Sequence, residues 1–105
     1  MPLQLTDAQS IKLNANIAQA SKALVSVHRA YQTGCLTPKH EQKARAVRNW
    51  MSVMLAQFED GYFYGAVDHQ KVKMMRHLET DANALLCSIY GVDDASDLSW
   101  MDHAV

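Results

Sequence analysis

The amino-acid sequence predicts an all-α protein, a bundle of three long antiparallel helices followed by a short acidic C-terminal segment. Apolar residues recur at steps of three and four in three stretches of at least four turns each, and this spacing gathers them on one side of a helix. Helix start and stop signals bracket the stretches. The 105 residues are 49% hydrophobic and 20% charged, with four glycines and two prolines, which excludes a disordered or fibrous chain. We expect one helical domain over residues 1–92 and an acidic tail over residues 93–105.

The first helix is predicted to begin near Asp7 and to end at Gly34. Thr6 and Gln9 have the spacing of a capping box, and glycine supplies the left-handed residue that ends many helices. Its main stripe consists of Leu13, Ile17, Ala20, Leu24, Val27 and Tyr31. A second row, broken only by Lys22, consists of Ala8, Ile11, Ala15, Ala18 and Val25. The first helix is therefore apolar on more than one face.

The second helix is predicted to begin at Thr37 and Pro38, as N-cap and first helical residue, and to run to about Asp60, before Gly61. Proline suits the first position because the missing N–H costs nothing there. Its stripe consists of Ala44, Val47, Met51, Met54 and Phe58. A flanking row consists of Ala46, Trp50 and Val53. This helix too has more apolar surface than one face can hold.

The third helix follows a segment in which Tyr62, Phe63 and Tyr64 stand between two glycines. Three successive rings cannot all point into one core. Asp68 can cap the third helix, which is expected to end at Gly91. Its stripe consists of Val72, Met75, Leu78, Ala82, Leu85 and Ile89, widened by Met74, Leu86 and Tyr90.

Charge order along the second and third helices favours an antiparallel pair. Both helices carry basic residues early and acidic residues late, the reverse of what the helix dipole favours. The groups that come level in an antiparallel pair are Glu59 and Asp60 with Lys71 and Lys73, and Arg45 and Arg48 with Glu79 and Asp81. Exposed pairs contribute only about 0–1 kcal/mol each, so this is an argument about register. Two solvated faces with unrelated charges remain the alternative.

Overall charge and hydropathy limit the classes of partner. Ten basic and eleven acidic residues give a net charge of −1, whereas a phosphate-binding domain normally has a strong positive excess. No apolar run approaches the ~18 residues that span a bilayer, and the N-terminus does not resemble a signal peptide. We therefore expect a cytoplasmic protein that does not enter a membrane, with Cys35 and Cys87 as free thiols.

No arrangement of residues indicates a catalytic or metal centre. None of the five histidines forms the i, i+4 pair that binds a metal on one side of a helix. Cys35 and His40 lack a third group that would orient the base. Paired carboxylates occur only as sequence neighbours, which do not face each other on a helix. We therefore expect no metal, no cofactor and no enzymatic activity.

Nucleic-acid binding is the alternative function. A basic cluster of Lys39, His40, Lys43, Arg45 and Arg48 could contact phosphates, and nearby aromatic rings could stack on bases. The near-neutral total charge and the length of the helices argue against a helix-turn-helix protein. Nucleic acid is therefore a disfavoured partner.

Methionine and aromatic residues outside the minimal stripes are the candidate contact residues, since these types are common at adaptable interfaces. The predicted protein-binding residues are Trp50, Met54, Tyr62, Phe63, Tyr64, Met74 and Trp100, with rim charges Lys43, Arg45 and Arg48. The predicted homodimer seam is Leu13, Ile17, Leu24, Val27 and Tyr31, because helix pairs associate through such spacing. A structural role in the core is the alternative for the methionine and aromatic residues.

Together these features predict a small protein-binding regulator. It would occupy a hydrophobic or dimerisation surface that its partner needs, as an inhibitor or anti-activator does, for example of a transcription regulator or a defence complex. The acidic tail would cover the basic rim until the partner arrives.

Overall fold

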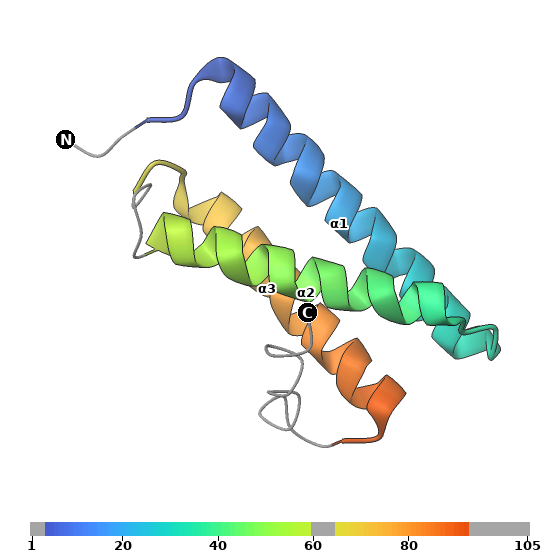
Figure 1. Cartoon of the computed structure of the whole chain (residues 1–105). Helices are drawn as coiled ribbons and strands as arrows, with labels where there is room; N and C mark the ends of the chain where they lie inside the picture. The colour runs from blue at the N-terminus through green and yellow to red at the C-terminus, as the bar shows by residue number, and fades with distance from the viewer. Residues whose placement is uncertain (1–3, 60–64, 93–105) are drawn as a thin grey trace.

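The described part of the chain forms three helices, connected up, down and up (Figure 1). The computed structural model describes residues 4–59 and 65–92. Its helices are α1 (Asp7–Thr33), α2 (Pro38–Glu59) and α3 (His69–Tyr90), and the described ranges hold no strand. The predicted all-α bundle is thereby confirmed, whereas the acidic segment 93–105 lies outside the described residues.

Both ends of α1 are closed as predicted. The backbone N–H of Gln9 donates to the Thr6 hydroxyl at 3.2 Å, and the backbone N–H of Thr6 donates to the Gln9 side chain at 2.9 Å. This reciprocal pair satisfies N–H groups that the first turn leaves without helical partners. At the other end Gly34 has φ +73°, a left-handed conformation that costs glycine little.

The start of α2 and both ends of α3 also agree with the sequence, whereas the predicted end of α2 at Asp60 and Gly61 lies outside the described residues. The carbonyl of Thr37 accepts from the backbone N–H of His40 at 3.0 Å, which starts the first turn of α2. The Asp68 carboxylate accepts from the backbone N–H of Lys71 at 2.9 Å and caps α3. Gly91 ends α3 with φ +71°. Local signals therefore set these helix ends.

The core lies along the line where the three helices meet. It contains only apolar side chains, and the described residues bury no polar or charged side chain. The fully buried large side chains are Met51, Met75, Leu86 and Val27. The remaining core residues are Leu13, Ile17, Ala20, Leu24, Ala44, Val47, Leu55, Leu78, Ala82 and Leu85.

Two stripe predictions were wrong by one residue near helix ends. At the end of α1 the structure buries Ala30 and leaves Tyr31 44% exposed. In the second half of α2 the buried residue is Leu55, and Met54 and Phe58 are half-buried. An α-helix has about 3.6 residues per turn, whereas alternating steps of three and four average about 3.5. The buried side therefore shifts gradually around a long helix.

Side-chain contacts fix the antiparallel pairing of α2 and α3. Glu59, at the end of α2, forms an ion pair with Arg76, where the sequence suggested Lys71 or Lys73. Nearer the start of α2, Arg48 Nε donates to Asn83 Oδ1 at 3.2 Å. The antiparallel arrangement is confirmed, but the partner of Glu59 differs from the predicted one.

The first and third helices run parallel. Lys71 Nζ donates to Asn14 Oδ1, a contact between residues 57 positions apart near the starts of both helices. Applying the same offset further along places residue 21 beside 78 and residue 31 beside 88. This register positions the groove described next.

Candidate protein-binding surface

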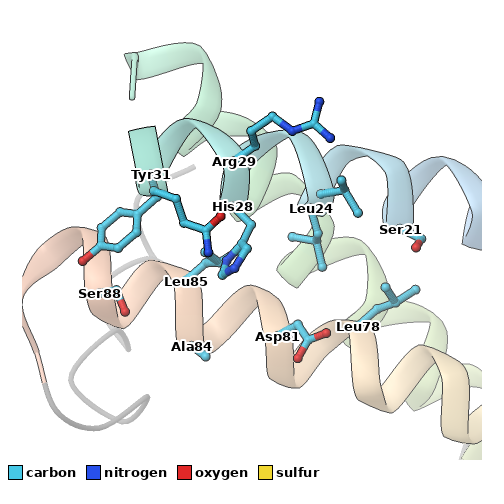
Figure 2. A pocket seen from close by; sticks show the side chains of 12 residues that line it. Ser21, Leu24, His28, Arg29, Tyr31, Leu78, Asp81, Ala84, Leu85 and Ser88 are labelled. Atoms are coloured by element: carbon cyan, nitrogen blue, oxygen red, sulfur yellow. The ribbon is translucent and has the colours of Figure 1, made fainter. Parts of the chain in front are cut away.

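A groove lies between the second halves of α1 and α3 (Figure 2). It has a volume of about 620 Å³ and is open along one side. Its lining from α1 is Ser21, Leu24, Val25, His28, Arg29, Tyr31 and Gln32, and its lining from α3 is Leu78, Asp81, Ala84, Leu85 and Ser88. We call this the α1–α3 groove.

Small side chains leave the space that forms the groove. Ser21 on α1 and Ala84 and Ser88 on α3 point toward the groove without filling it (Figure 2). Leu24 and Leu85 contribute apolar walls and also pack in the core. An apolar floor between polar rims is the form of surface into which an amphipathic helix fits.

Charges of both signs line the rim of the groove. On α1 the rim carries His28 and Arg29, and on α3 it carries Asp81. Asp81 lies 3.4 Å from His77 Nε2, one turn earlier on α3. This contact is exposed and contributes an ion pair only when His77 is protonated. The α1 rim is therefore basic, and the α3 rim carries a carboxylate.

A second exposed apolar surface lies on the side of α1 that faces away from the core. We call it the outer face of α1 and define it by Ala8, Ile11, Ala15, Ala18, Lys22 and Val25, all exposed. Ile11 is 70% exposed and Val25 is 55% exposed. This is the second apolar row that the sequence predicted on the first helix, and no other described helix packs against it.

Four residues of the predicted dimer seam are buried within one chain. Leu13, Ile17, Leu24 and Val27 lie on the side of α1 that packs against α2 and α3. They cannot contact a second copy in this fold, because each is less than a tenth exposed. Only Tyr31 of the predicted seam is exposed, and it lines the α1–α3 groove.

The predicted contact residues are not gathered into one patch. Trp50 and Met54 are half-buried and pack against the core from α2. Met74 is 46% exposed on α3. Tyr62, Phe63, Tyr64 and Trp100 lie outside the described residues. The described members therefore include one exposed side chain, and Trp50 and Met54 contribute mainly to packing.

The predicted rim charges lie on α2, which does not line the groove. Lys43 is exposed. Arg48 turns toward α3 and Asn49, since its guanidinium donates to Asn83 and to Asn49 Oδ1 at 2.9 Å. Arg45 is half-buried beside Tyr90. The arginines thus take part in helix contacts.

Among the described residues, Tyr90 is the titratable side chain whose pKa is clearly shifted, and it lies beside Glu41. The Tyr90 hydroxyl donates to the Glu41 carboxylate across the α2–α3 interface. Partial burial and then the neighbouring carboxylate raise the pKa of Tyr90 to about 12, because both disfavour the phenolate. The pair lies at the edge of the helix interface, and its role is structural.

The described residues hold no group of three His, Cys, Asp or Glu side chains that could bind a metal ion. Within the same ranges, none of the three helices has an apolar window long enough to cross a bilayer. Cys35 is exposed and Cys87 half-buried, and both are free thiols. Comparison with known protein families, curated proteins and solved structures found no match.

The sequence did not reveal the α1–α3 groove. Its lining mixes stripe residues such as Leu24 with polar residues such as Ser21 and Gln32, so no periodic signal marks it. A usable signal would have been the small residues Ser21, Ala84 and Ser88 on the facing sides of two helices. Recognising them requires the parallel register of α1 and α3, which only the structure supplies.

Proposed function

We propose that this protein is a small regulator that binds another protein and acts by occupying a surface which that partner needs. The observation that supports it most is the α1–α3 groove, an apolar cleft of about 620 Å³ rimmed by charge. Exposed apolar surfaces with polar rims are typical of protein interaction sites. The partner is expected to contribute an apolar helix face, so the action is steric and not catalytic.

The register of the groove sets the size of the partner segment. Its lining runs from residue 21 to 32 on α1 and from residue 78 to 88 on α3, which is about eleven residues or about 16 Å of helix. A partner helix of three turns would place two or three apolar side chains along it at steps of three and four. Acidic residues on the flank beside α1 would meet the basic rim of His28 and Arg29.

A matched pair of variants tests the groove. Ala84→Arg places a long side chain in the groove, whereas Ala46→Arg adds the same side chain at an exposed alanine of α2. We expect wild type and Ala46→Arg to retain the same protein from a lysate of the native host, and Ala84→Arg to lose it. Circular dichroism checks that both variants fold.

The steric mechanism has its own readout. The retained protein, once identified by mass spectrometry, is purified and its self-association measured with and without this chain. A partner whose own assembly is lost on binding supports occupation of its dimerisation surface. Equal retention by both arginine variants, or a partner whose assembly is unchanged, contradicts the proposal.

The nucleic-acid alternative rests on the basic cluster of α2. Since Arg48 is engaged with Asn83 and Asn49, the most accessible cations there are Lys39 and Lys43. A nucleic-acid-binding protein would lose affinity steeply with salt and on neutralising both lysines. Salt-dependent binding to DNA or RNA, abolished by Lys39→Gln with Lys43→Gln, would favour this alternative. A cytoplasmic location remains part of the proposal.

A further inference from the structure

The geometry points to a second copy of this chain as the occupant of the outer face of α1, packed antiparallel to it. This inference does not rest on the groove, because the two surfaces lie on different sides of α1. Val25 belongs to both, and Arg29 lines the groove close to the end of the outer face. The sequence predicted a homodimer, but through residues that the fold buries. In the structure, the exposed apolar row lies on the opposite side of the same helix.

Spacing along the outer face is that of a two-helix seam. Its six residues follow steps of three, four, three, four and three, and that heptad pattern keeps a seam in contact between two helices. The large side chains, Ile11 and Val25, stand fourteen residues apart near the two ends. Ala15 and Ala18 lie between them and let the helix backbones approach closely. The face is long and narrow, and no described part of the chain packs against it.

Antiparallel pairing makes the face complementary to itself. In the register where Ala15 packs against Ala18 of the second copy, Val25 lies opposite Ala8. Ile11 then lies against the aliphatic stem of Lys22, whose ammonium group can extend into solvent. Each contact occurs twice about a two-fold axis, as an isologous interface requires.

Charge selects the antiparallel orientation over the parallel one. Parallel helices would place Lys22 against Lys22 and Arg29 against Arg29 of the second copy, and like charges at such positions are destabilising. The antiparallel register brings Asp7 within about 5 Å, along the axis, of Arg29 in the second copy. The described part of the chain records no ion pair for Asp7 or Arg29. Both charges are therefore available to a second copy.

The dimensions of the face predict a weak dimer. From Ala8 to Val25 it is about 27 Å long and about 10 Å wide, well below the ~800 Å² per partner of a standard interface. Two copies should therefore associate reversibly as the protein concentration rises. A single charge placed in the seam should be enough to prevent it.

Sedimentation equilibrium tests the surface with a matched control. Ile11→Glu puts a charge in the seam, and Val53→Glu makes the equivalent change on α2, where Val53 is 62% exposed. Up to about 1 mM protein, we expect the average mass of wild type and Val53→Glu to rise from 11.8 kDa toward twice that value. Ile11→Glu should stay at the monomer mass. Wild type that remains monomeric, or an equal loss in both variants, overturns the proposal.

Cysteine cross-linking tests the orientation. In a background of Cys35→Ser with Cys87→Ala, one protein carries Ala8→Cys and another carries Val25→Cys. Antiparallel pairing predicts disulfide-linked dimers when the two proteins are mixed and oxidised, and little linkage of either alone. Parallel pairing predicts the reverse and would overturn the inference, as would an absence of linkage in every sample.

Failure of this inference is separable from failure of the proposed function. Ala84→Arg blocks the groove and leaves the seam residues intact, so it should self-associate as wild type does. Ile11→Glu should still retain the partner protein that the groove binds. Loss of one property without the other shows which surface was assigned wrongly.

Discussion

Replacing Tyr90 with phenylalanine tests the contact that joins the start of α2 to the end of α3. The change removes the hydroxyl that donates to Glu41 and leaves the ring in place. A hydrogen bond to a charged acceptor contributes about 1.5–3 kcal/mol, and the lower end applies because both side chains are only half-buried. We therefore expect Tyr90→Phe to lower the free energy of unfolding by about 1.5 kcal/mol at neutral pH.

The pKa of Tyr90 sets the pH range of this test. Burial first, and then the neighbouring Glu41 carboxylate, raise this pKa from 10.0 to about 12, because both disfavour the phenolate in the folded protein. The folded-state pKa is the higher one, so the stabilisation is fully present below pH 10. It is lost as pH rises toward 12, because the unfolded chain releases its proton first.

Urea unfolding followed by circular dichroism measures both effects. Wild type should exceed Tyr90→Phe by about 1.5 kcal/mol at neutral pH, and the gap should shrink as pH rises from 10 toward about 12. Taking the difference at each pH cancels the titration of groups that the two proteins share. Glu41→Ala completes a double-mutant cycle, since the removal of either partner should remove most of the coupling. Equal stability at neutral pH, or a gap that persists unchanged at the highest pH, would refute the assigned contact.

Three further changes test the core, a helix end and a surface ion pair. Met51 has no exposed area, and Met51→Ala should lower the free energy of unfolding in urea by about 2–5 kcal/mol. Val53 is 62% exposed, and Val53→Ala should change it by less than about 0.5 kcal/mol. Gly34→Ala should cost about 1 kcal/mol because its φ is +73° with open space around it, and a melting temperature equal to wild type would show that the left-handed turn is wrong. Arg76→Ala removes the exposed ion pair with Glu59 and should cost no more than about 1 kcal/mol, less in high salt; a larger, salt-independent loss would contradict this assignment.

Local chemistry made the helices and their ends predictable. The Thr6 and Gln9 box, the Asp68 cap and the glycines at 34 and 91 each act within one turn of the chain. The direction of α3 relative to α2 was also available from the order of charges. These features are predictable because each depends on residues close in sequence or on a pattern that runs the length of a helix.

The choice between the two apolar faces of α1 was not predictable from periodicity. The Leu13 row and the Ile11 row both have helical spacing, and spacing alone does not state which row meets α2 and α3. Side-chain size gives the physical reason for the outcome. The buried row contains Leu13, Ile17 and Leu24, whereas the middle of the outer row is Ala15 and Ala18. Burying the larger row removes more apolar area from water.

The absence of polar side chains from the described core bears on how adaptable the groove is. Specific polar contacts between helices, such as Lys71 with Asn14, lie at the periphery. A small tilt of α1 would therefore break no hydrogen bond between buried side chains of the described core. Met51 and Met75 at the centre can change rotamer and keep the core filled during such a movement. The width of the α1–α3 groove can consequently change with small movements of α1, and the partner helix proposed above would help to set it.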